Sequence, residues 1–173
     1  MGLAVSLLFD GATTAAVQAL WERLAEAGIS TSMLDLGYAP HLTLTVVQDE
    51  ALADELQGKL SQQAWGDALD VEIGPTDRFD GTEVVWLGCA GDRLSALQRD
   101  VCTLVSLGDI EPHYRPETWV PHLTLQTSGD AEAARAIASR LWPGKIKAQA
   151  VAVELVRFRP VVPLWRAEFQ TVP

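Results

Sequence analysis

The spacing of apolar and polar residues along the chain predicts a protein in which strands and helices are mixed. Short apolar runs and period-two alternation predict strands at 3–9, 41–47, 69–73, 83–90, 122–127, 146–157 and 162–171. Apolar residues at helical spacing predict helices at 12–27, 49–63, 94–104 and 130–141. Elements in this order favour the α+β class, with two mainly antiparallel sheets flanked by helices.

One five-residue segment, PHLTL, occurs twice in the chain, at residues 40–44 and 121–125. Sliding the sequence by the same 81 residues also aligns an aromatic residue three positions before each histidine and the apolar run that opens each half. A repeated order of elements indicates two structural units built on one plan. We therefore expect a single domain over 1–173 with two pseudo-symmetric lobes, about 1–80 and 81–173, around a central cleft.

The repeated segment combines an apolar and a polar face in one strand. Side chains alternate between the two faces of a strand, so His41 and Thr43 share one face, and His122 and Thr124 share the corresponding face of the second copy. The intervening leucines face the other way, toward a core. The histidine and threonine of a pair stand about 7 Å apart along the strand. If a pseudo-two-fold axis relates the lobes, both polar faces converge on one cleft.

Two imidazoles and two hydroxyls in one cleft suit the cleavage of a phosphodiester. Histidine has an ordinary pKa of about 6.5, so near neutral pH one ring can be neutral while the other is protonated. The neutral ring can take a proton from an attacking water, and the protonated ring can give one to the departing alkoxide. Hydroxyl groups can donate hydrogen bonds to the non-bridging oxygens. We predict His41 and His122 as the catalytic pair, and Thr43 and Thr124 as substrate-binding residues.

Other chemistries fit the sequence less well. A zinc site uses three or four His, Cys or carboxylate ligands, whereas this motif pairs each histidine with threonine, so we expect no metal and no cofactor. A nucleophilic serine would be expected in a G-x-S-x-G turn, which the chain lacks. Cys89 and Cys102 fall in apolar segments and are expected to be buried free thiols. A purely structural repeat would need only its leucines and prolines, and it does not explain why the histidines and threonines persist.

Composition narrows the choice of partner. The formal net charge is −10, which argues against an extended nucleic-acid surface, because non-specific affinity comes from basic groups that neutralise phosphates. A small ligand is therefore easier to accommodate than a long polymer, and we expect no membrane partner. No apolar run is long enough to cross a membrane and no signal peptide is recognised, so a cytoplasmic location is expected. The oligomeric state stays open.

Two H-x-[ST]-φ motifs (φ is apolar) about eighty residues apart resemble those of the two-histidine (2H) phosphoesterases. This superfamily includes bacterial 2′-5′ RNA ligases and 2′,3′-cyclic nucleotide phosphodiesterases. The segments HLTL at 41–44 and 122–125 match both signatures, and the strand VVWLG at 84–88 is similar to the one that opens the second lobe in many members. The resemblance implies a bilobal α+β fold, a metal-independent reaction and a phosphodiester substrate.

By that resemblance His41 and His122 are the catalytic pair, and Thr43 and Thr124 bind the phosphate. Ligase-type members often continue the motif with an aromatic residue and glycine, whereas this chain continues with TVV and QTS. We therefore expect hydrolysis of 2′,3′-cyclic or 2′,5′-linked phosphodiesters, with a small nucleotide or an RNA end as the substrate. The alternatives are a 2′-5′ RNA ligase, a non-catalytic module that binds nucleotides or RNA ends, and a structural partner protein.

Several residues near the motifs have two readings. His113 is expected at the surface rather than at the phosphate. Tyr38 and Trp119 could stack on a base of the substrate, or they could pack beside the motif strand, and the sequence favours neither role. Arg157 and Arg159 share one strand face and suit a cleft that holds phosphate, but strict alternation places them on the core side.

Overall fold

The computed structural model describes residues 2–170 and contains the predicted mixture of strands and helices. The strands are β1 (Gly2–Phe9), β2 (His41–Val47), β3 (Leu69–Arg78), β4 (Val85–Ala90), β5 (His122–Gln126), β6 (Ile146–Phe158) and β7 (Val162–Glu168). The helices are α1 (Gly11–Glu26), α2 (Ser32–Asp35), α3 (Ala53–Ser61), α4 (Leu94–Cys102) and α5 (Ala131–Leu141). Short 3-10 turns lie at Glu50–Leu52, Leu107–Asp109 and Pro112–Tyr114.

Three of the differences from the predicted boundaries have a clear local reason. Strand β3 continues to Arg78, because Gly74 and Pro75 interrupt the alternation after Ile73 but only shift the register of the strand. Helix α2 has four residues, which is too short for a periodic pattern. The last strand ends at Glu168 rather than near 171, and residue 171 lies outside the described residues.

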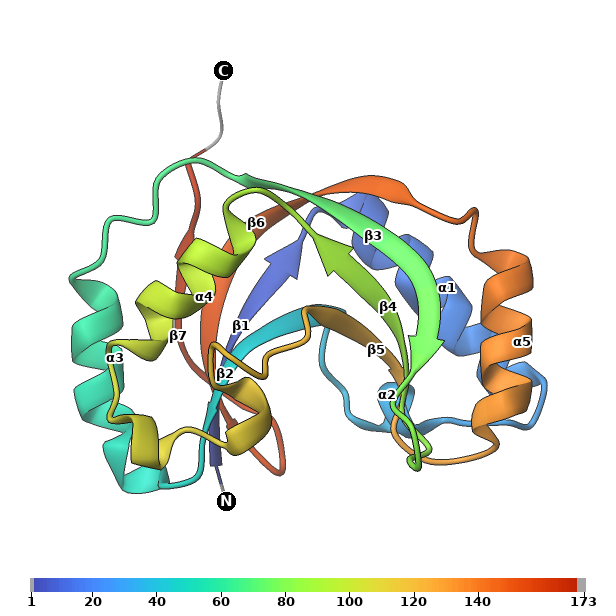
Figure 1. The fold of residues 1–173 in the computed structure, drawn as a ribbon, viewed down its shortest axis with the longest axis horizontal. Coiled ribbons are helices and arrows are strands. Elements are labelled where there is room, and N and C mark those ends of the chain that lie inside the picture. The colour runs from blue at the N-terminus through green and yellow to red at the C-terminus, as the bar shows by residue number, and fades with distance from the viewer. Residues whose placement is uncertain (1, 171–173) are drawn as a thin grey trace.

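The strands join into one continuous antiparallel sheet rather than the two sheets that were expected. Their order is β1-β2-β5-β4-β3-β6-β7, and β6 also pairs with β1, so six strands return to their starting point. The reason is the length of β6, whose 13 residues pair with β3 near one end and with β1 over the rest. The resulting sheet is strongly curved, as Figure 1 shows.

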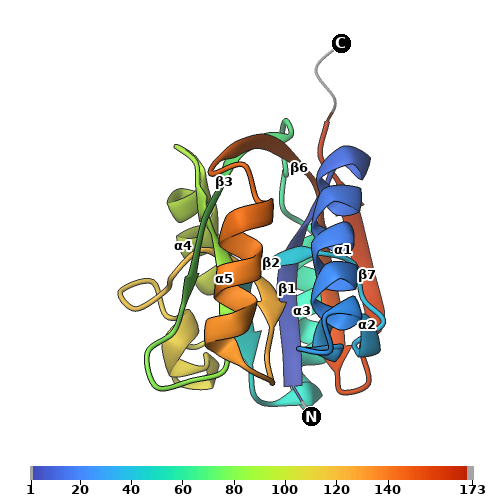
Figure 2. The same ribbon diagram turned by 90° about the vertical axis from the view of Figure 1, so that its right-hand side faces the viewer.

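Each motif strand is covered by a helix from the other half of the sequence. Helix α1 packs on β5, and helix α4 packs on β2 (Figure 1). Helix α5 lies beside α1 and covers β3 and β4 (Figure 2). Strand pairing also crosses the midpoint, since β3 pairs with β4 and β6 pairs with β1. The division into lobes at about residue 80 stays a prediction. Strands and helices on one side of this residue pair with or pack on strands of the other side.

The hydrophobic core fixes which face of each motif strand is turned outward. Leu42, Leu44 and Leu123 are fully buried, and Leu125 is 2% exposed. Each fully buried leucine stabilises the fold by about 1.5–3 kcal/mol relative to exposure. A slip of one residue would exchange these leucines for histidine and threonine, so their burial holds the register. As predicted, the polar residues of both motifs are turned away from the core.

Two further predictions concern the rest of the chain. Cys89 and Cys102 are buried free thiols, as expected, and burial raises the pKa of both. Among residues 2–170, no helix is long and apolar enough to span a membrane.

Candidate active site

The two motif strands lie side by side and meet at their leucines. Leu42 of β2 is paired with Leu123 of β5 in an antiparallel arrangement. The antiparallel register therefore brings His41 next to Thr124, and Thr43 next to His122. Each histidine lies across from the threonine of the other motif, on the face opposite the core. The four predicted site residues thus form one cluster.

Two adjoining cavities open along this cluster. The cavity at His41 has a volume of about 180 Å³, and the cavity at His122 has a volume of about 520 Å³. Both are lined by Tyr114, Thr124 and Thr127, so they meet between the two histidines. A ligand at their junction has access to both motifs.

The two histidines are held in the same way by the backbone. Nδ1 of His41 lies 2.8 Å from the carbonyl oxygen of Ala39, and Nδ1 of His122 lies 2.7 Å from that of Val120. A carbonyl oxygen only accepts, so each Nδ1 carries the proton and donates it. In the neutral ring Nε2 is then the free acceptor. Both rings therefore leave Nε2 for chemistry.

Electrostatics favours the neutral form of both rings when the site is empty of anions. Burial lowers the pKa of His41; the Ala39 carbonyl opposes this effect, and a positive charge on His122 lowers the pKa further. Burial also lowers the pKa of His122, against the effect of the Val120 carbonyl. Because the two rings repel each other when both are charged, the state with one proton is favoured over the state with two. That singly protonated state is the one an acid–base pair needs.

Tryptophan side chains hold the backbone of both threonines. The indole N–H of Trp119 donates to the carbonyl oxygen of Thr43 at 3.0 Å, and that of Trp21 donates to the carbonyl oxygen of Thr124 at 3.1 Å. The Thr43 hydroxyl lies 3.5 Å from that of Ser6. The contact made by Trp21 could not be predicted from the sequence, because this residue falls within the apolar stripe of α1, where packing is the expected role.

The aromatic surroundings of the two rings differ. The ring of Tyr38 lies beside that of His41, with centroids 4.8 Å apart. His122 meets Phe79 edge-on at 5.1 Å and Trp86 at 6.0 Å. Sequence reasoning missed Phe79 and Trp86, which come from the turn after β3 and from β4. The alternation of β4 does point Trp86 away from the core, but only the pairing of β4 with β5 places it at this site.

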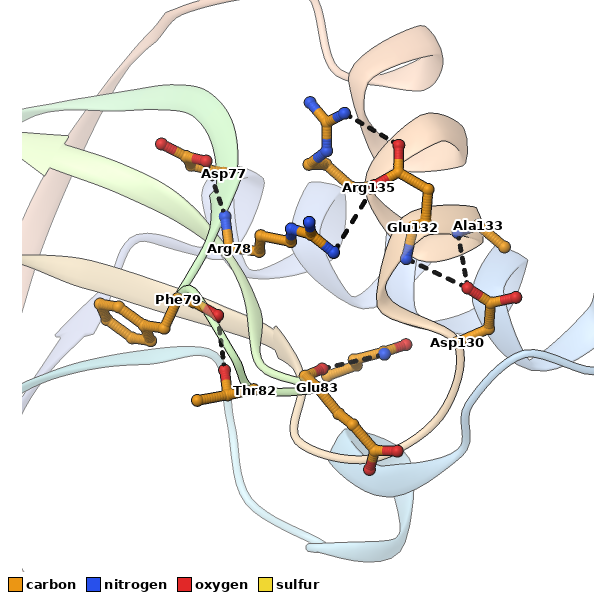
Figure 3. Close-up of polar contacts among 10 residues, drawn as sticks. Asp77, Arg78, Phe79, Thr82, Glu83, Asp130, Glu132, Ala133 and Arg135 are labelled. Atoms are coloured by element: carbon orange, nitrogen blue, oxygen red, sulfur yellow. Dashed lines mark hydrogen bonds and ion pairs between the residues drawn. The ribbon is translucent and has the colours of Figure 1, made fainter.

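Phe79 is held by the hairpin that joins β3 to β4. The Thr82 hydroxyl donates to the carbonyl oxygen of Phe79 at 2.9 Å (Figure 3). The hairpin is tied to the second motif strand by Gln126, whose side-chain amide donates to the carbonyl oxygen of Glu83 at 3.0 Å. These contacts fix the aromatic wall of the larger cavity relative to His122.

Three residues of the surrounding loops complete the site. Tyr114 is half-buried and lines both cavities; burial and Glu111 raise the pKa of its hydroxyl, which the Thr43 hydroxyl opposes. Arg159 lines the His41 cavity, because β6 ends at Phe158 and strict alternation no longer applies. His113 is exposed at the rim of the larger cavity.

Within the described part of the chain, no group of three or more His, Cys, Asp or Glu side chains is placed to hold a metal ion.

A paired His/Thr site on a curved antiparallel sheet is the arrangement of a two-histidine, phosphoesterase-like enzyme. The family model of the 2′-5′ RNA ligase superfamily matches residues 15–160. The chain therefore belongs to the 2′-5′ RNA ligase superfamily, within the 2H phosphoesterases. No curated protein matches the sequence.

Solved structures show the same fold at low sequence identity. Escherichia coli LigT, in a complex with NADP+, superposes with a TM-score of 0.65 at 16% identity, covering 96% of each chain. A protein described as a phosphoesterase gives a TM-score of 0.63 at 16% identity, covering 96% of this chain and 97% of that one. The MHV ns2 PDE domain gives 0.54 at 12% identity, covering 97% of this chain and 99% of that one. The α+β class is thereby confirmed.

Proposed function

We propose that this enzyme hydrolyses 2′,3′-cyclic or 2′,5′-linked phosphodiesters of small nucleotides or RNA ends, without a metal ion, by paired-histidine acid–base catalysis. The observation that carries the proposal is the matched tethering of Nδ1 in His41 and His122, which leaves Nε2 free on two strands whose register puts each histidine across from a threonine. Family membership supports the same reaction type.

Each group has a defined part in one turnover. Nε2 of the neutral histidine takes a proton from the attacking water as its oxygen bonds to phosphorus, and Nε2–H of the other histidine protonates the leaving oxygen as its bond breaks. Each proton transfer contributes roughly 10²–10⁴-fold to the rate. The Thr43 and Thr124 hydroxyls donate to the non-bridging oxygens, where negative charge gathers. The histidines end with exchanged protonation states, and solvent restores them.

The larger cavity supports a nucleotide as the substrate. Phe79, Trp119 and Val84 give it an apolar and aromatic lining next to His122. Aromatic faces stack on bases with an energy of about 1–3 kcal/mol per base. A nucleoside with its base in this cavity would present its phosphate at the junction with the His41 cavity.

The charge distribution supports a short substrate. Among the described residues that line the two cavities, Arg159 is the one arginine or lysine. With a formal net charge of −10, the rest of the molecule offers little to a long polyanion. Arg159 suits one phosphate at the mouth of the site.

The proposal is tested with a panel of 2′,3′-cyclic mononucleotides and 2′,5′-linked dinucleotides, assayed with and without EDTA. We expect turnover that EDTA leaves unchanged, and a fall of at least about 100-fold in both His41→Ala and His122→Ala, since each removes one proton transfer. Full activity in either variant would refute the paired scheme. Nucleotide binding without turnover on the whole panel would favour a binding module.

The superfamily name also includes ligation. Ligation is the reverse of cleaving a 2′,5′ linkage to a 2′,3′-cyclic phosphate, and it needs the same acid–base pair. A 5′-hydroxyl of a second RNA would then replace water and attack the 2′,3′-cyclic phosphate, and the bond from phosphorus to the 3′ oxygen would break. One histidine takes the proton of the attacking hydroxyl, and the other protonates the departing 3′ oxygen. The same panel, supplemented with an RNA that has a free 5′-hydroxyl end, distinguishes joining from cleavage by product length.

A further inference from the structure

A buried carboxylate lies behind His41 and is not accounted for by the two motifs. Glu154 of β6 is 5% exposed, and the strand register places it beside Ser6 of β1 and Arg166 of β7. Burying a carboxylate costs several kcal/mol unless partners satisfy it. Its presence on the site side of the sheet therefore calls for a partner.

Its short hydrogen bond is with Tyr38. The Tyr38 hydroxyl donates to Oε2 of Glu154 at 2.6 Å. The other oxygen lies 3.9 Å from Nη1 of Arg166, a side chain that is 46% exposed and bonds to Glu168 at 2.7 Å. An ion pair this long, with a half-exposed partner, contributes little. Tyr38 is thus the main described partner of Glu154.

Tyr38 connects this carboxylate to the catalytic histidine. Its ring lies 4.8 Å from the His41 ring, at an interplanar angle of 53°. Tyr38 belongs to the loop before β2, so no strand ladder holds it, and its hydroxyl is anchored on Glu154. Burial and Glu154 raise the pKa of Tyr38, so the hydroxyl stays protonated and keeps donating.

We propose that Glu154 and Tyr38 are a positioning pair that fixes the His41 imidazole in its working orientation. The inference rests on the proposed function of His41. The bond from Nδ1 to Ala39 restrains one atom of the ring, and Tyr38 restrains its face. His122 is held differently, between Phe79 and Trp86.

The two repeats differ at the position of Tyr38, which supports a role for Tyr38 that its counterpart in the second repeat does not share. Tyr38 and Trp119 are equivalent under the shift of 81 residues. Tyr38 anchors on a carboxylate and contacts the histidine of its own motif, whereas Trp119 donates to the Thr43 carbonyl of the other motif. Within residues 2–170, Glu154 is the buried carboxylate, and it reaches His41 through Tyr38.

Four variants test the pair. Tyr38→Phe keeps the ring and removes the anchor, Glu154→Ala removes the acceptor, and Glu154→Gln keeps an acceptor without the charge. Tyr38→Phe combined with Glu154→Leu replaces the bond by an apolar contact, so that the fold does not carry an unpaired buried carboxylate. Glu168→Gln is the matched control, because this exposed carboxylate also bonds to Arg166 but does not reach Tyr38.

We expect Tyr38→Phe, Glu154→Ala and the apolar double variant to lower kcat roughly 5- to 30-fold with KM changed less than about twofold, as a misplaced catalytic group does. Glu154→Gln should retain most of kcat, and Glu168→Gln all of it. A uniform loss of stability without this split between kcat and KM would overturn the proposal.

Imidazole NMR gives a readout that does not depend on turnover. The chain has three histidines, so each signal can be assigned from His41→Ala and His122→Ala. Besides Tyr38, the charged and titratable groups around His41 are Tyr114 and Arg159, which line its cavity, and His122 across the junction. Because these stay unchanged in Tyr38→Phe, its effect should appear in the His41 signals and leave those of His122 and His113 in place. Unchanged His41 signals would refute the positioning role even if the enzyme is active. Shifted signals in a protein without turnover would support positioning and refute the proposed function.

Discussion

Leu42 and Leu123 lie directly opposite each other, and they are the residue pair that joins β2 to β5. Both are fully buried, so the histidine and threonine that flank each leucine are turned to the other side of the sheet. The two histidines come from strands 81 residues apart and owe their proximity to this apolar pair. The cluster of His41, Thr43, His122 and Thr124 is thus positioned from the core side.

The pH profile of kcat/KM should have its maximum on the acid side. Burial lowers the pKa of both His41 and His122 from the ordinary value. In the free enzyme the base is inactive when it is protonated, and the acid is inactive when it is deprotonated. Lower pKa values therefore shift both limbs of the profile to lower pH. The maximum should lie below about pH 6.5. A maximum well above pH 7, measured with a 2′,3′-cyclic nucleotide, would contradict these pKa directions.

The same shifts predict a loss of stability on acidification. A histidine whose pKa is lower in the folded state leaves the unfolded chain with more bound protons below about pH 6.5. The free energy of unfolding should therefore fall as pH decreases through that value. Urea unfolding of His41→Asn should show a weaker dependence between pH 7 and pH 5 than the wild type. An identical pH dependence in the two proteins would rule out this role for His41.

Removing the threonine hydroxyls should slow the chemical step. Thr43→Val and Thr124→Val keep the branched shape and delete the donor to the phosphate oxygens. Loss of one such donor costs on the order of 10²-fold in kcat where charge develops. Steady-state kinetics on the same cyclic nucleotide measures it. The matched control is Thr103→Val, a helix-end threonine whose hydroxyl bonds to the Asp100 carbonyl. A kcat equal to that of the control would remove both threonines from the mechanism.

The bond from Trp21 to the second motif strand should be visible in stability. Trp21→Phe removes the N–H that satisfies the Thr124 carbonyl, and we expect a loss of about 1 kcal/mol in the free energy of unfolding. Trp65→Phe is the control, because the indole nitrogen of Trp65 has no hydrogen-bond partner among the described residues. Equal losses in the two variants, measured by chemical denaturation, would show that ring packing rather than the hydrogen bond is responsible.

Arg159 should act on substrate binding rather than on chemistry. Arg159→Ala is expected to raise KM about 10-fold for a 2′,5′-linked dinucleotide that carries a terminal phosphate, the equivalent of one phosphate contact, with a smaller change in kcat. The effect should shrink at high salt, because an exposed charge is screened. Arg157→Ala, in the same segment and exposed, should behave as the wild type. A larger effect on kcat than on KM would assign Arg159 to the reaction itself.

The local pattern was sufficient for part of this site and not for the rest. Alternation within PHLTL predicted the outward faces of both motifs, because the period of a strand is a property of adjacent residues. Phe79, Trp86 and Glu154 could not be placed in the same way, since their approach depends on which strands pair and in which register. The single continuous sheet was missed for the same reason, because one long strand was not expected to serve two partners.

The helix that packs on each motif strand comes from the other half of the sequence, and this limits how the chain can be divided. Trp21 of α1 bonds to β5, and Gln98 of α4 bonds to the carbonyl oxygen of Leu44 in β2 at 3.2 Å. Neither half of the sequence supplies the helix that packs on its own motif strand. A polypeptide of half this length could bring two such histidine rings together only as a dimer. Cleaving the chain near its middle should therefore yield two fragments that fold together or not at all.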